Sequence, residues 1–169
     1  MIKKSIVFTV SVLSVIIMWS CAGSIEKKYK NTKEMIDDAK SKVEYVSVEK
    51  LKTIMDNGEK YYLIDCRETT EFDSACIKGA INIPRGLLES QVAEKAPAHR
   101  TTVYIYCSNG DRSTLAATVL PKLKYADVRV LEGGFDVLKT KFPDLVEMAP
   151  VRGEAKSKAP AKPSGGCGG

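Results

Sequence analysis

The 169-residue sequence has few of the side chains that most metal centres use. It contains one histidine, His99, and five cysteines, and no two of the cysteines form a C-x-x-C motif. A structural zinc site and a Cys-His protease pair are therefore not expected. No apolar run reaches the roughly 20 residues of a membrane-spanning helix, which excludes a polytopic membrane protein. The excess of 26 basic over 21 acidic residues is small and scattered, so it does not favour nucleic acid as a partner.

The first 21 residues have the pattern of an export signal. Lys3 and Lys4 precede an apolar run of 14 residues, Ile6–Trp19, which has the length of a secretory signal core. A small residue and Cys21 follow, and this junction resembles the lipobox of bacterial lipoproteins. The resemblance implies that residues 1–20 are a signal peptide and that Cys21 becomes lipidated. The protein would then be lipid-anchored in the bacterial cell envelope, on a membrane surface that faces the periplasm. Soluble export after cleavage and an uncleaved anchor stay open as alternatives.

The remaining chain divides into a tether, a domain and a tail. Residues 21–42 are polar and mixed in charge, and we interpret them as the lipidated N-terminus and a tether, with a short helix after Thr32. Residues 43–145 hold the apolar segments of one globular domain. Residues 146–169, rich in Lys, Ala, Pro and Gly, cannot build a core and predict a flexible tail.

The domain alternates between strand-like and helix-like segments. Short apolar runs predict strands at Tyr61–Ile64, Ala80–Ile83, Thr102–Tyr106 and Val128–Leu131. The segments between them predict helices at Val48–Asn57, Glu68–Ala75, Leu87–Lys95, Asp111–Leu120 and Phe135–Lys141. This alternation indicates an α/β fold with a central, mainly parallel sheet flanked by helices.

The segment that follows the strand Thr102–Tyr106 is the candidate site. Cys107 lies between the end of this strand and the start of a helix, where parallel sheets bind their ligands. The helix N-terminus and the charge of Arg112 favour the thiolate and lower the pKa of Cys107. Gly110 lets the loop curl, so that several N–H groups point at one anionic group. We therefore predict Cys107 as the nucleophile, with a surrounding loop that consists of Ser108, Asn109, Gly110, Asp111, Arg112 and Ser113.

Several motifs of the domain occur together in one order. They are LIDCRE at Leu63–Glu68 with Glu71-Phe72, IKGAINIP at Ile77–Pro84, CSNGDRS at Cys107–Ser113 and LEGGF at Leu131–Phe135. In order and spacing they resemble a single-domain rhodanese over roughly residues 43–145. The resemblance implies a rhodanese-like α/β fold and a sulfurtransferase in which Cys107 carries a persulfide. The sulfur donor would be thiosulfate, a polysulfide or a persulfide. The acceptor would be a thiol, a cyanide-like molecule or a protein. No metal and no organic cofactor is implied.

Two other functions stay open for this loop. Related phosphatases and arsenate reductases place arginine six positions after the cysteine, whereas Arg112 stands five positions after Cys107. The shorter loop fits a single sulfur atom better than a phosphate or an arsenate. The second alternative is a rhodanese module that relays sulfur or binds a partner without rapid turnover. Activity with a soluble acceptor such as cyanide would separate this module from an enzyme.

Two charged positions near the loop have more than one interpretation. Asp111 places a carboxylate at the rim of an anion site, where it would oppose thiosulfate. It either points outward or pairs with Arg112. Arg67 ends a neighbouring strand together with Asp65, so it either faces the site or forms a salt bridge beside it.

Three further cysteines of the chain bear on sulfur chemistry. Cys66 also lies at a strand end, and our hypothesis is that it approaches Cys107 and forms a disulfide that resolves a persulfide. The alternative for Cys66, as for Cys76, is a small buried core residue. Cys167 stands among glycines, where a mobile thiol could accept sulfur from Cys107, bind a soft metal or link two chains; the alternative is a dispensable tail.

Overall fold

The computed structural model of the chain describes residues 29–148. Helix α2 (Thr32–Lys40) is the helix expected after Thr32, and the Asn31 side chain accepts the N–H of Glu34 at 2.9 Å at its start. The predicted signal peptide, Cys21 and Cys167 lie outside the described residues. Within residues 29–148, no helix is long and apolar enough to cross a membrane.

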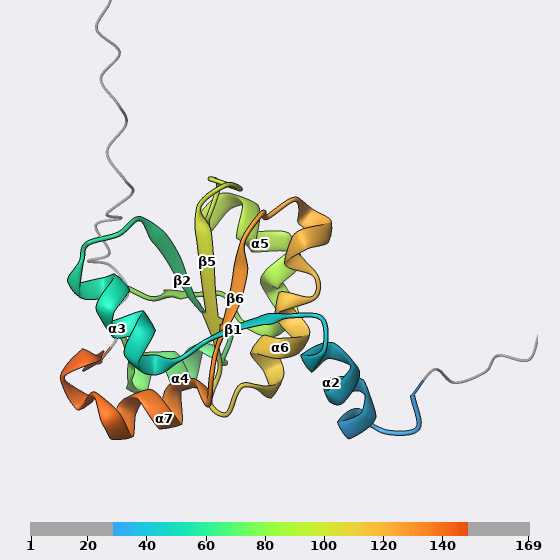
Figure 1. Cartoon of the computed structure of the whole chain (residues 1–169), viewed down its shortest axis with the longest axis horizontal. Coiled ribbons are helices and arrows are strands. Elements are labelled where there is room, and N and C mark those ends of the chain that lie inside the picture. Colours follow the sequence, from blue (N-terminus) through green and yellow to red (C-terminus); the bar gives the residue numbers. More distant parts are fainter. Residues whose placement is uncertain (1–28, 149–169) are drawn as a thin grey trace, which may run out of the picture. The chain divides into compact units, whose positions relative to one another are not determined.

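A five-stranded parallel sheet forms the centre of the domain (Figure 1). Its order is β1-β6-β5-β2-β4, and every neighbouring pair is parallel. Its strands are β1 (Glu44–Val46), β2 (Tyr61–Asp65), β4 (Ile81–Asn82), β5 (Thr102–Tyr106) and β6 (Val128–Leu131). The helices of the domain are α3 (Val48–Asp56), α4 (Thr69–Ser74), α5 (Leu88–Lys95), α6 (Asp111–Ala117) and α7 (Gly134–Lys141). The predicted α/β fold with a mainly parallel sheet is therefore confirmed.

Both faces of the sheet are covered by helices, which explains why the central strands are almost wholly apolar. Successive side chains of a strand point to opposite faces. Ile64 and Ile105 pack on one face with residues of α5 and α6, whereas Leu63 and Tyr106 pack on the other with residues of α3 and α7. Each fully buried side chain of this size contributes about 1.5–3 kcal/mol to stability. The two layers hold the carboxyl ends of β2 and β5 rigidly side by side.

Helix α6 is shorter than the sequence predicts. The pattern predicts a helix over Asp111–Leu120, whereas α6 ends at Ala117 and a 3-10 helix, Leu120–Leu123, follows. Pro121 lies inside that 3-10 helix, and a proline has no N–H with which to continue an α-helix. The bounds of β5 and β6 coincide with the predicted strands.

A second, two-stranded sheet extends the domain beyond its predicted end at residue 145. Strand β7 (Val146–Glu147) pairs antiparallel with β3 (Cys76–Ile77), and the Tyr106 hydroxyl accepts the N–H of Ile77 at 3.1 Å. The small sheet is thus attached to the end of β5. Strand pairing therefore includes the first two residues of the segment 146–169, which we predicted as a tail. The side chain of Val146 also packs against an apolar core. The rest of that segment lies outside the described residues.

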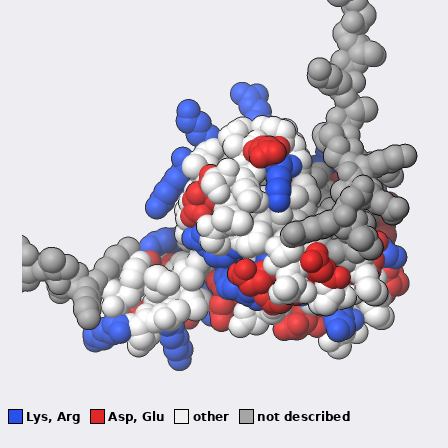
Figure 2. Space-filling view, turned by 180° about the vertical axis from the view of Figure 1, so that it is seen from behind, with Lys and Arg blue, Asp and Glu red and all other residues white. Residues whose placement is uncertain are grey.

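The described surface carries both signs of charge. Figure 2 shows Lys and Arg side chains interspersed with Asp and Glu side chains on the face seen from behind. Some of these residues form ion pairs one helical turn apart, such as Lys52 with Asp56 and Arg85 with Glu89. Pairs of this kind stabilise a helix only weakly, by about 0.3–0.5 kcal/mol.

Candidate active site

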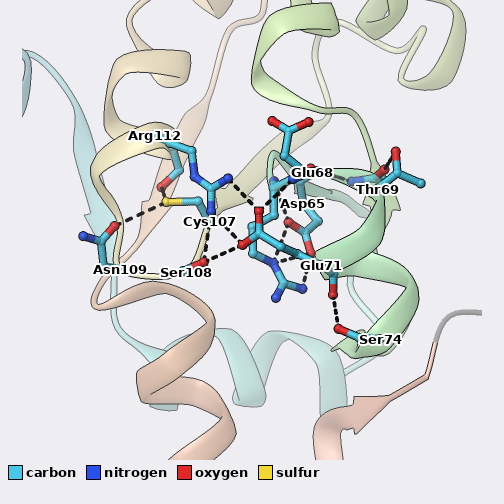
Figure 3. A network of polar contacts seen from close by, with 12 residues as sticks. Asp65, Glu68, Thr69, Glu71, Ser74, Cys107, Ser108, Asn109 and Arg112 are labelled. Carbon is cyan, nitrogen blue, oxygen red and sulfur yellow. Dashed lines mark hydrogen bonds and ion pairs between the residues drawn. The ribbon is translucent and has the colours of Figure 1, made fainter.

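The loop that carries Cys107 joins β5 to α6 (Figure 3). Gly110 has a φ of +101°, a conformation that side chains strongly disfavour, and it turns the chain so that α6 begins at Asp111. The Thr114 hydroxyl donates to the Gly110 carbonyl at 2.8 Å, and the Ser113 hydroxyl oxygen lies 2.9 Å from the same carbonyl oxygen. The first turn of α6 therefore fixes the bend of the loop.

Hydrogen-bond donors surround the sulfur of Cys107. The N–H of Gly110 donates to Sγ at 3.2 Å, and the Ser113 hydroxyl does so at 3.6 Å. The neighbouring thiol of Cys66 is the largest single cause that lowers the pKa of Cys107 to about 5. Burial acts in the opposite direction, but the donors outweigh it. A pKa lowered in this way favours the thiolate form of Cys107 at neutral pH.

The pKa of the Cys66 thiol shifts in the opposite direction. It follows β2 directly and is fully buried, and its hydrogen bond to Cys107 together with burial raises the pKa of the Cys66 thiol far above its usual range. One sulfur thus carries the negative charge and the other carries the proton. Because the N–H of Cys66 donates to the Tyr106 carbonyl at 2.9 Å, Cys66 lies beside Cys107, and no disulfide joins the two.

Arg112 lies at the rim of the site and is engaged by a carboxylate. Its Nη1 and Nη2 atoms donate to the two oxygens of Glu71, each at 2.8 Å. The Ser108 hydroxyl lies between the two groups, 3.0 Å from Arg112 Nη2 and 3.0 Å from Glu71 Oε1. The Arg112 guanidinium holds the pKa of the Glu71 carboxyl at about 2. Glu71 therefore stays ionised and neutralises the cation beside Cys107 (Figure 3).

Sequence reasoning missed Glu71 as a site residue. It lies in α4, where its carboxylate also accepts the N–H of Glu68 at 3.1 Å and so completes a capping box at the start of the helix. The capping box positions the carboxylate for Arg112. A search for the partner of Arg112 within the Glu71-Phe72 motif could have found it.

The position of Asp111 settles one of the alternatives from the sequence. Asp111 accepts the side-chain N–H of Asn109 at 2.9 Å, and its own N–H donates to the Asn109 amide oxygen at 3.2 Å. Arg112 is paired with Glu71 instead. The alternative in which Asp111 pairs with Arg112 is therefore wrong, because α4 supplies a better-placed carboxylate. Asn109 also places its amide oxygen 3.8 Å from the Cys107 sulfur.

Arg67 belongs to a buried ion pair beside the site. Its Nε atom donates to both carboxylate oxygens of Asp65, at 3.1 Å to Oδ1 and 3.0 Å to Oδ2. Its Nη2 atom donates to Asp65 Oδ2 at 2.6 Å and to the Ala75 carbonyl at 2.6 Å. Its guanidinium carbon also lies 4.0 Å from the centre of the Phe135 ring. The side chains of Arg67 and Asp65 are only 5% and 0% exposed. This arrangement matches the salt-bridge alternative, in which Arg67 ties the end of β2 to its surroundings.

The first turn of α7 holds the loop from the other side. The N–H groups of Phe135 and Asp136 donate to the carbonyls of Cys107 and Ser108, at 2.8 and 3.1 Å. A Cβ atom on Gly134 would stand 2.4 and 2.5 Å from the same two carbonyl oxygens, and Gly134 has a φ of +63°. Only glycine therefore allows this close approach.

A shallow hollow of about 250 Å³ borders the loop. Its lining includes Asn109, Gly110, Tyr45 and Glu132. Cys107 itself has no exposed surface, so a donor reaches its sulfur only when loop side chains move. In the loop, Asn109 is exposed, and Ser108 and Arg112 are half-buried, so these side chains are more accessible than the Cys107 sulfur.

The other predicted residues lie away from Cys107 or outside the described residues. Cys76 is buried in β3, and desolvation raises the pKa of its thiol to about 11. Its position matches a small core residue. No group of three or more His, Cys, Asp or Glu side chains within residues 29–148 is arranged to hold a metal ion.

These features define a class of protein: a parallel α/β domain with a nucleophilic thiolate in the loop between a strand and a helix. Residues 47–141 match the rhodanese-like domain, and the chain therefore belongs to this family. The domain has sulfurtransferase homologues, as the sequence motifs predict.

Three relatives illustrate the similarity. The chain is 36% identical over 103 residues to the probable adenylyltransferase/sulfurtransferase MoeZ of Mycobacterium tuberculosis. The aligned residues are 60% of this chain and 26% of that protein. The chain is also 31% identical over 78 residues to the thiosulfate sulfurtransferase PspE of Escherichia coli. The aligned residues are 46% of this chain and 75% of that protein. The structure of a thiosulfate sulfurtransferase from Pseudomonas aeruginosa has a TM-score of 0.60 and 24% identity, and covers 67% of this chain and 22% of that one.

The extent of these matches differs between the relatives. The chain spans about a quarter of the mycobacterial protein and three quarters of the E. coli protein. The likeness to the P. aeruginosa structure shows the fold alone. The activities of the whole relatives apply to this chain only as proposals.

Proposed function

We propose that the protein is a sulfurtransferase that moves sulfane sulfur through a persulfide on Cys107. The observation that carries this proposal is the environment of the Cys107 sulfur, which accepts the N–H of Gly110 at 3.2 Å and has its pKa lowered to about 5. A thiolate is the form of cysteine that attacks sulfur, and the lowered pKa of Cys107 favours this form at neutral pH.

The reaction with thiosulfate illustrates the chemistry. The Cys107 thiolate attacks the sulfane sulfur, the bond between Cys107 Sγ and that sulfur forms, and the bond to the sulfonate sulfur breaks. Sulfite leaves with the electron pair of the broken bond, and the persulfide keeps the negative charge. In the second half-reaction a thiol or cyanide takes the outer sulfur and regenerates the Cys107 thiolate. The N–H of Gly110 and the Ser113 hydroxyl stabilise the anionic sulfur in both half-reactions.

The rim determines which donors are favoured. Arg112 is the cation of the loop that an anionic donor would meet, but its Nη1 and Nη2 atoms both donate to Glu71 at 2.8 Å. A dianion such as thiosulfate therefore competes with the Glu71 carboxylate for this guanidinium, whereas a polysulfide or a persulfide can react without a bound sulfonate. Both kinds of donor therefore belong to the proposal, and measured rates with each would rank them.

One observation supports a second candidate, a relay or binding module without rapid turnover. Cys107 is 0% exposed, so the sulfur does not meet solvent in this conformation. A protein that hands sulfur to one docked partner needs no open pocket. Turnover with cyanide separates the two candidates, because cyanide is small enough to enter wherever a donor enters.

The cellular location is a further part of the proposal. The segment from Lys3 to Cys21 supports export and lipid attachment at Cys21, with the domain on the periplasmic side of an envelope membrane. Incorporation of labelled fatty acid into the wild-type protein, and its loss in Cys21→Ser, would test this location. Equal labelling of both proteins would contradict it.

Intact mass spectrometry tests the catalytic proposal. The full chain is reduced, incubated with thiosulfate or with a polysulfide, freed of donor and weighed beside Cys107→Ser and Cys76→Ser. In wild type and in Cys76→Ser we expect a gain of one sulfur atom or, where the loaded sulfur has already left as sulfide, the loss of two hydrogens. Neither change should occur in Cys107→Ser. A wild-type chain that shows neither change with any donor would contradict the proposal, and phosphate and arsenate assays would follow.

A further inference from the structure

We propose that Cys66 is an internal sulfur acceptor that attacks the Cys107 persulfide, forms a Cys66–Cys107 disulfide and releases hydrogen sulfide. This inference rests on the proposed function, because it needs a persulfide on Cys107. It adds a second reacting residue, and it makes sulfide a product of the protein without any external thiol in the first step.

Strand register places the two cysteines next to each other. Asp65 of β2 is the register partner of Tyr106 of β5, and the N–H of Cys66 donates to the Tyr106 carbonyl at 2.9 Å, so the pairing continues past the strands. Cys66 directly follows Asp65 and Cys107 directly follows Tyr106, so the two cysteines occupy the next positions of these paired segments. Neighbouring strands lie about 4.8 Å apart. Disulfides join Cα atoms that are roughly 4.4–6.8 Å apart, so this spacing suits a disulfide.

The two side chains also share a face of the sheet. Cys66 and Cys107 belong to the same apolar cluster as Ile64 and Ile105, in the layer covered by α5 and α6. The neighbouring thiols also shift each other's pKa, which is lowered at Cys107 and raised at Cys66. A thiol on the same face, at the adjacent register position, needs little movement to reach the Cys107 sulfur.

Burial gives this internal thiol an advantage over external acceptors. Both cysteines are 0% exposed, so bulk thiols do not contact the Cys107 sulfur in this conformation. Cys66 is held beside it permanently, and fixed proximity of this kind raises the effective concentration of a reacting group by orders of magnitude. The first acceptor that a newly formed persulfide meets is therefore Cys66.

The step balances without an added oxidant. The Cys66 sulfur attacks the inner sulfur of the Cys107 persulfide, the Cys66–Cys107 bond forms, and the bond from Cys107 to the outer sulfur breaks. The outer sulfur leaves with that electron pair and takes the Cys66 proton as hydrosulfide. The sulfane sulfur is reduced by two electrons, and the two cysteines are oxidised to a disulfide. An external dithiol then reduces this disulfide and returns both cysteines to thiols.

The charge on Cys107 keeps Cys66 inactive until sulfur is loaded. The largest cause of the raised pKa of Cys66 is its hydrogen bond to the Cys107 thiolate. Persulfide formation moves the negative charge from that atom to the outer sulfur, which weakens this effect and favours ionisation of Cys66. Arg112 also lowers the pKa of Cys66 by its charge.

The experiment uses the full chain, reduced and kept free of oxygen, with thiosulfate as the donor and no added thiol. Thiosulfate yields sulfite during loading, so any sulfide comes from the later step. Wild type is compared with Cys66→Ser, whose hydroxyl keeps a donor beside Cys107, and with Cys76→Ser, which removes another buried cysteine. Sulfide is measured in solution, and alkylated peptides show which cysteines are free, persulfidated or linked. A parallel series with a polysulfide is read from the peptides alone, because polysulfide itself releases sulfide.

We expect wild type and Cys76→Ser to release about one equivalent of sulfide per chain and to form the Cys66–Cys107 link. Cys66→Ser should accumulate the persulfide on Cys107 and release no sulfide until cyanide or a thiol is added. A stable persulfide in wild type, with Cys66 still free, would overturn the internal acceptor while leaving the proposed function intact. If no protein in the series gains sulfur or forms the Cys66–Cys107 link with either donor, both proposals fall. The wild-type peptide result stands even if Cys66→Ser does not fold.

Discussion

Two arginine–carboxylate pairs flank the active loop, and they differ mainly in their burial. The pair of Arg67 with Asp65 is 5% and 0% exposed, with its shortest contact at 2.6 Å. The pair of Arg112 with Glu71 is 36% and 35% exposed, with contacts of 2.8 Å. The first pair joins the end of β2 to the segment that precedes β3, whereas the second lies at the rim of the loop that carries Cys107.

The difference in burial indicates which of the two pairs can exchange partners. A buried carboxylate loses its hydration on folding, so Asp65 depends on Arg67 for compensation. A half-exposed pair is screened by water and contributes little to stability, so Glu71 can release Arg112 to a substrate at a small cost. The same chemical pair thus serves as a structural support in one place and as an adjustable binding group in the other.

The largest expected effect tests the structural half of this comparison. Arg67→Met leaves the Asp65 carboxylate buried without its partner, and the free energy of unfolding should fall by about 3–5 kcal/mol. Urea denaturation of wild type and of the variant measures this change. The matched control is Arg112→Met, which should lower the free energy of unfolding by less than about 1 kcal/mol. Equal losses in the two variants would show that burial does not separate the pairs.

The second prediction concerns catalysis at the rim. Arg112→Met removes the cation that meets an anionic donor, so kcat/KM for thiosulfate should fall roughly tenfold, chiefly through KM. Steady-state assays with thiosulfate and cyanide measure this change. Arg85→Met provides the control, since Arg85 pairs with Glu89 on the surface and should keep wild-type kinetics. A polysulfide donor, which needs less help from Arg112, should show a smaller loss; an equal loss would contradict the role of Arg112 in binding the sulfonate.

The third prediction separates the rim from the thiolate. The ultraviolet absorbance of the Cys107 thiolate, taken as the difference from Cys107→Ser, should appear as pH rises through about 5. Ser113→Ala removes a hydrogen-bond donor to the sulfur and should raise this pKa more than Arg112→Met does. A larger shift in Arg112→Met would mean that the rim charge, and not the local donors, keeps Cys107 ionised.

The smallest effect concerns the acid stability of the exposed pair. The pKa of Glu71 is lowered from 4.5 to about 2, chiefly by its hydrogen bond with Arg112. A lowered pKa in the folded state adds stability above pH 4.5, which is lost as pH falls towards 2. Because the pair is exposed, the amount should be under about 1 kcal/mol. Urea denaturation from pH 6 to about pH 2 should show a steeper loss in wild type than in Glu71→Gln; parallel curves would contradict this contribution.

The fold was largely predictable because its signals are local. The runs Thr102–Tyr106 and Val128–Leu131 are apolar and bounded by turn residues, and they match β5 and β6. Pro121 ends α6 sooner than the helical pattern suggests. The strand Val146–Glu147 could not be predicted, since a two-residue strand depends on a partner, β3, that lies far away in the sequence.

The site was predictable where chemistry depends on sequence neighbours. Cys107, Gly110 and Ser113 lie within one loop, so their arrangement follows from the strand, the turn and the helix. Glu71 was missed because its contact with Arg112 crosses from α4 to α6 and depends on a capping box. The closeness of Cys66 to Cys107 could be formulated as a hypothesis because both follow strands predicted to be parallel.

The approach of Gly134 to the carbonyls of Cys107 and Ser108 has a consequence for transplanting this chemistry. Those carbonyls are held by the N–H groups of Phe135 and Asp136, from a turn remote in the chain. A graft of CSNGDRS onto a foreign scaffold would carry the nucleophile but not the clamp that orients its peptide groups. The portable unit is therefore the loop together with the glycine turn, and a designer who copies only the loop should obtain an ordinary thiol.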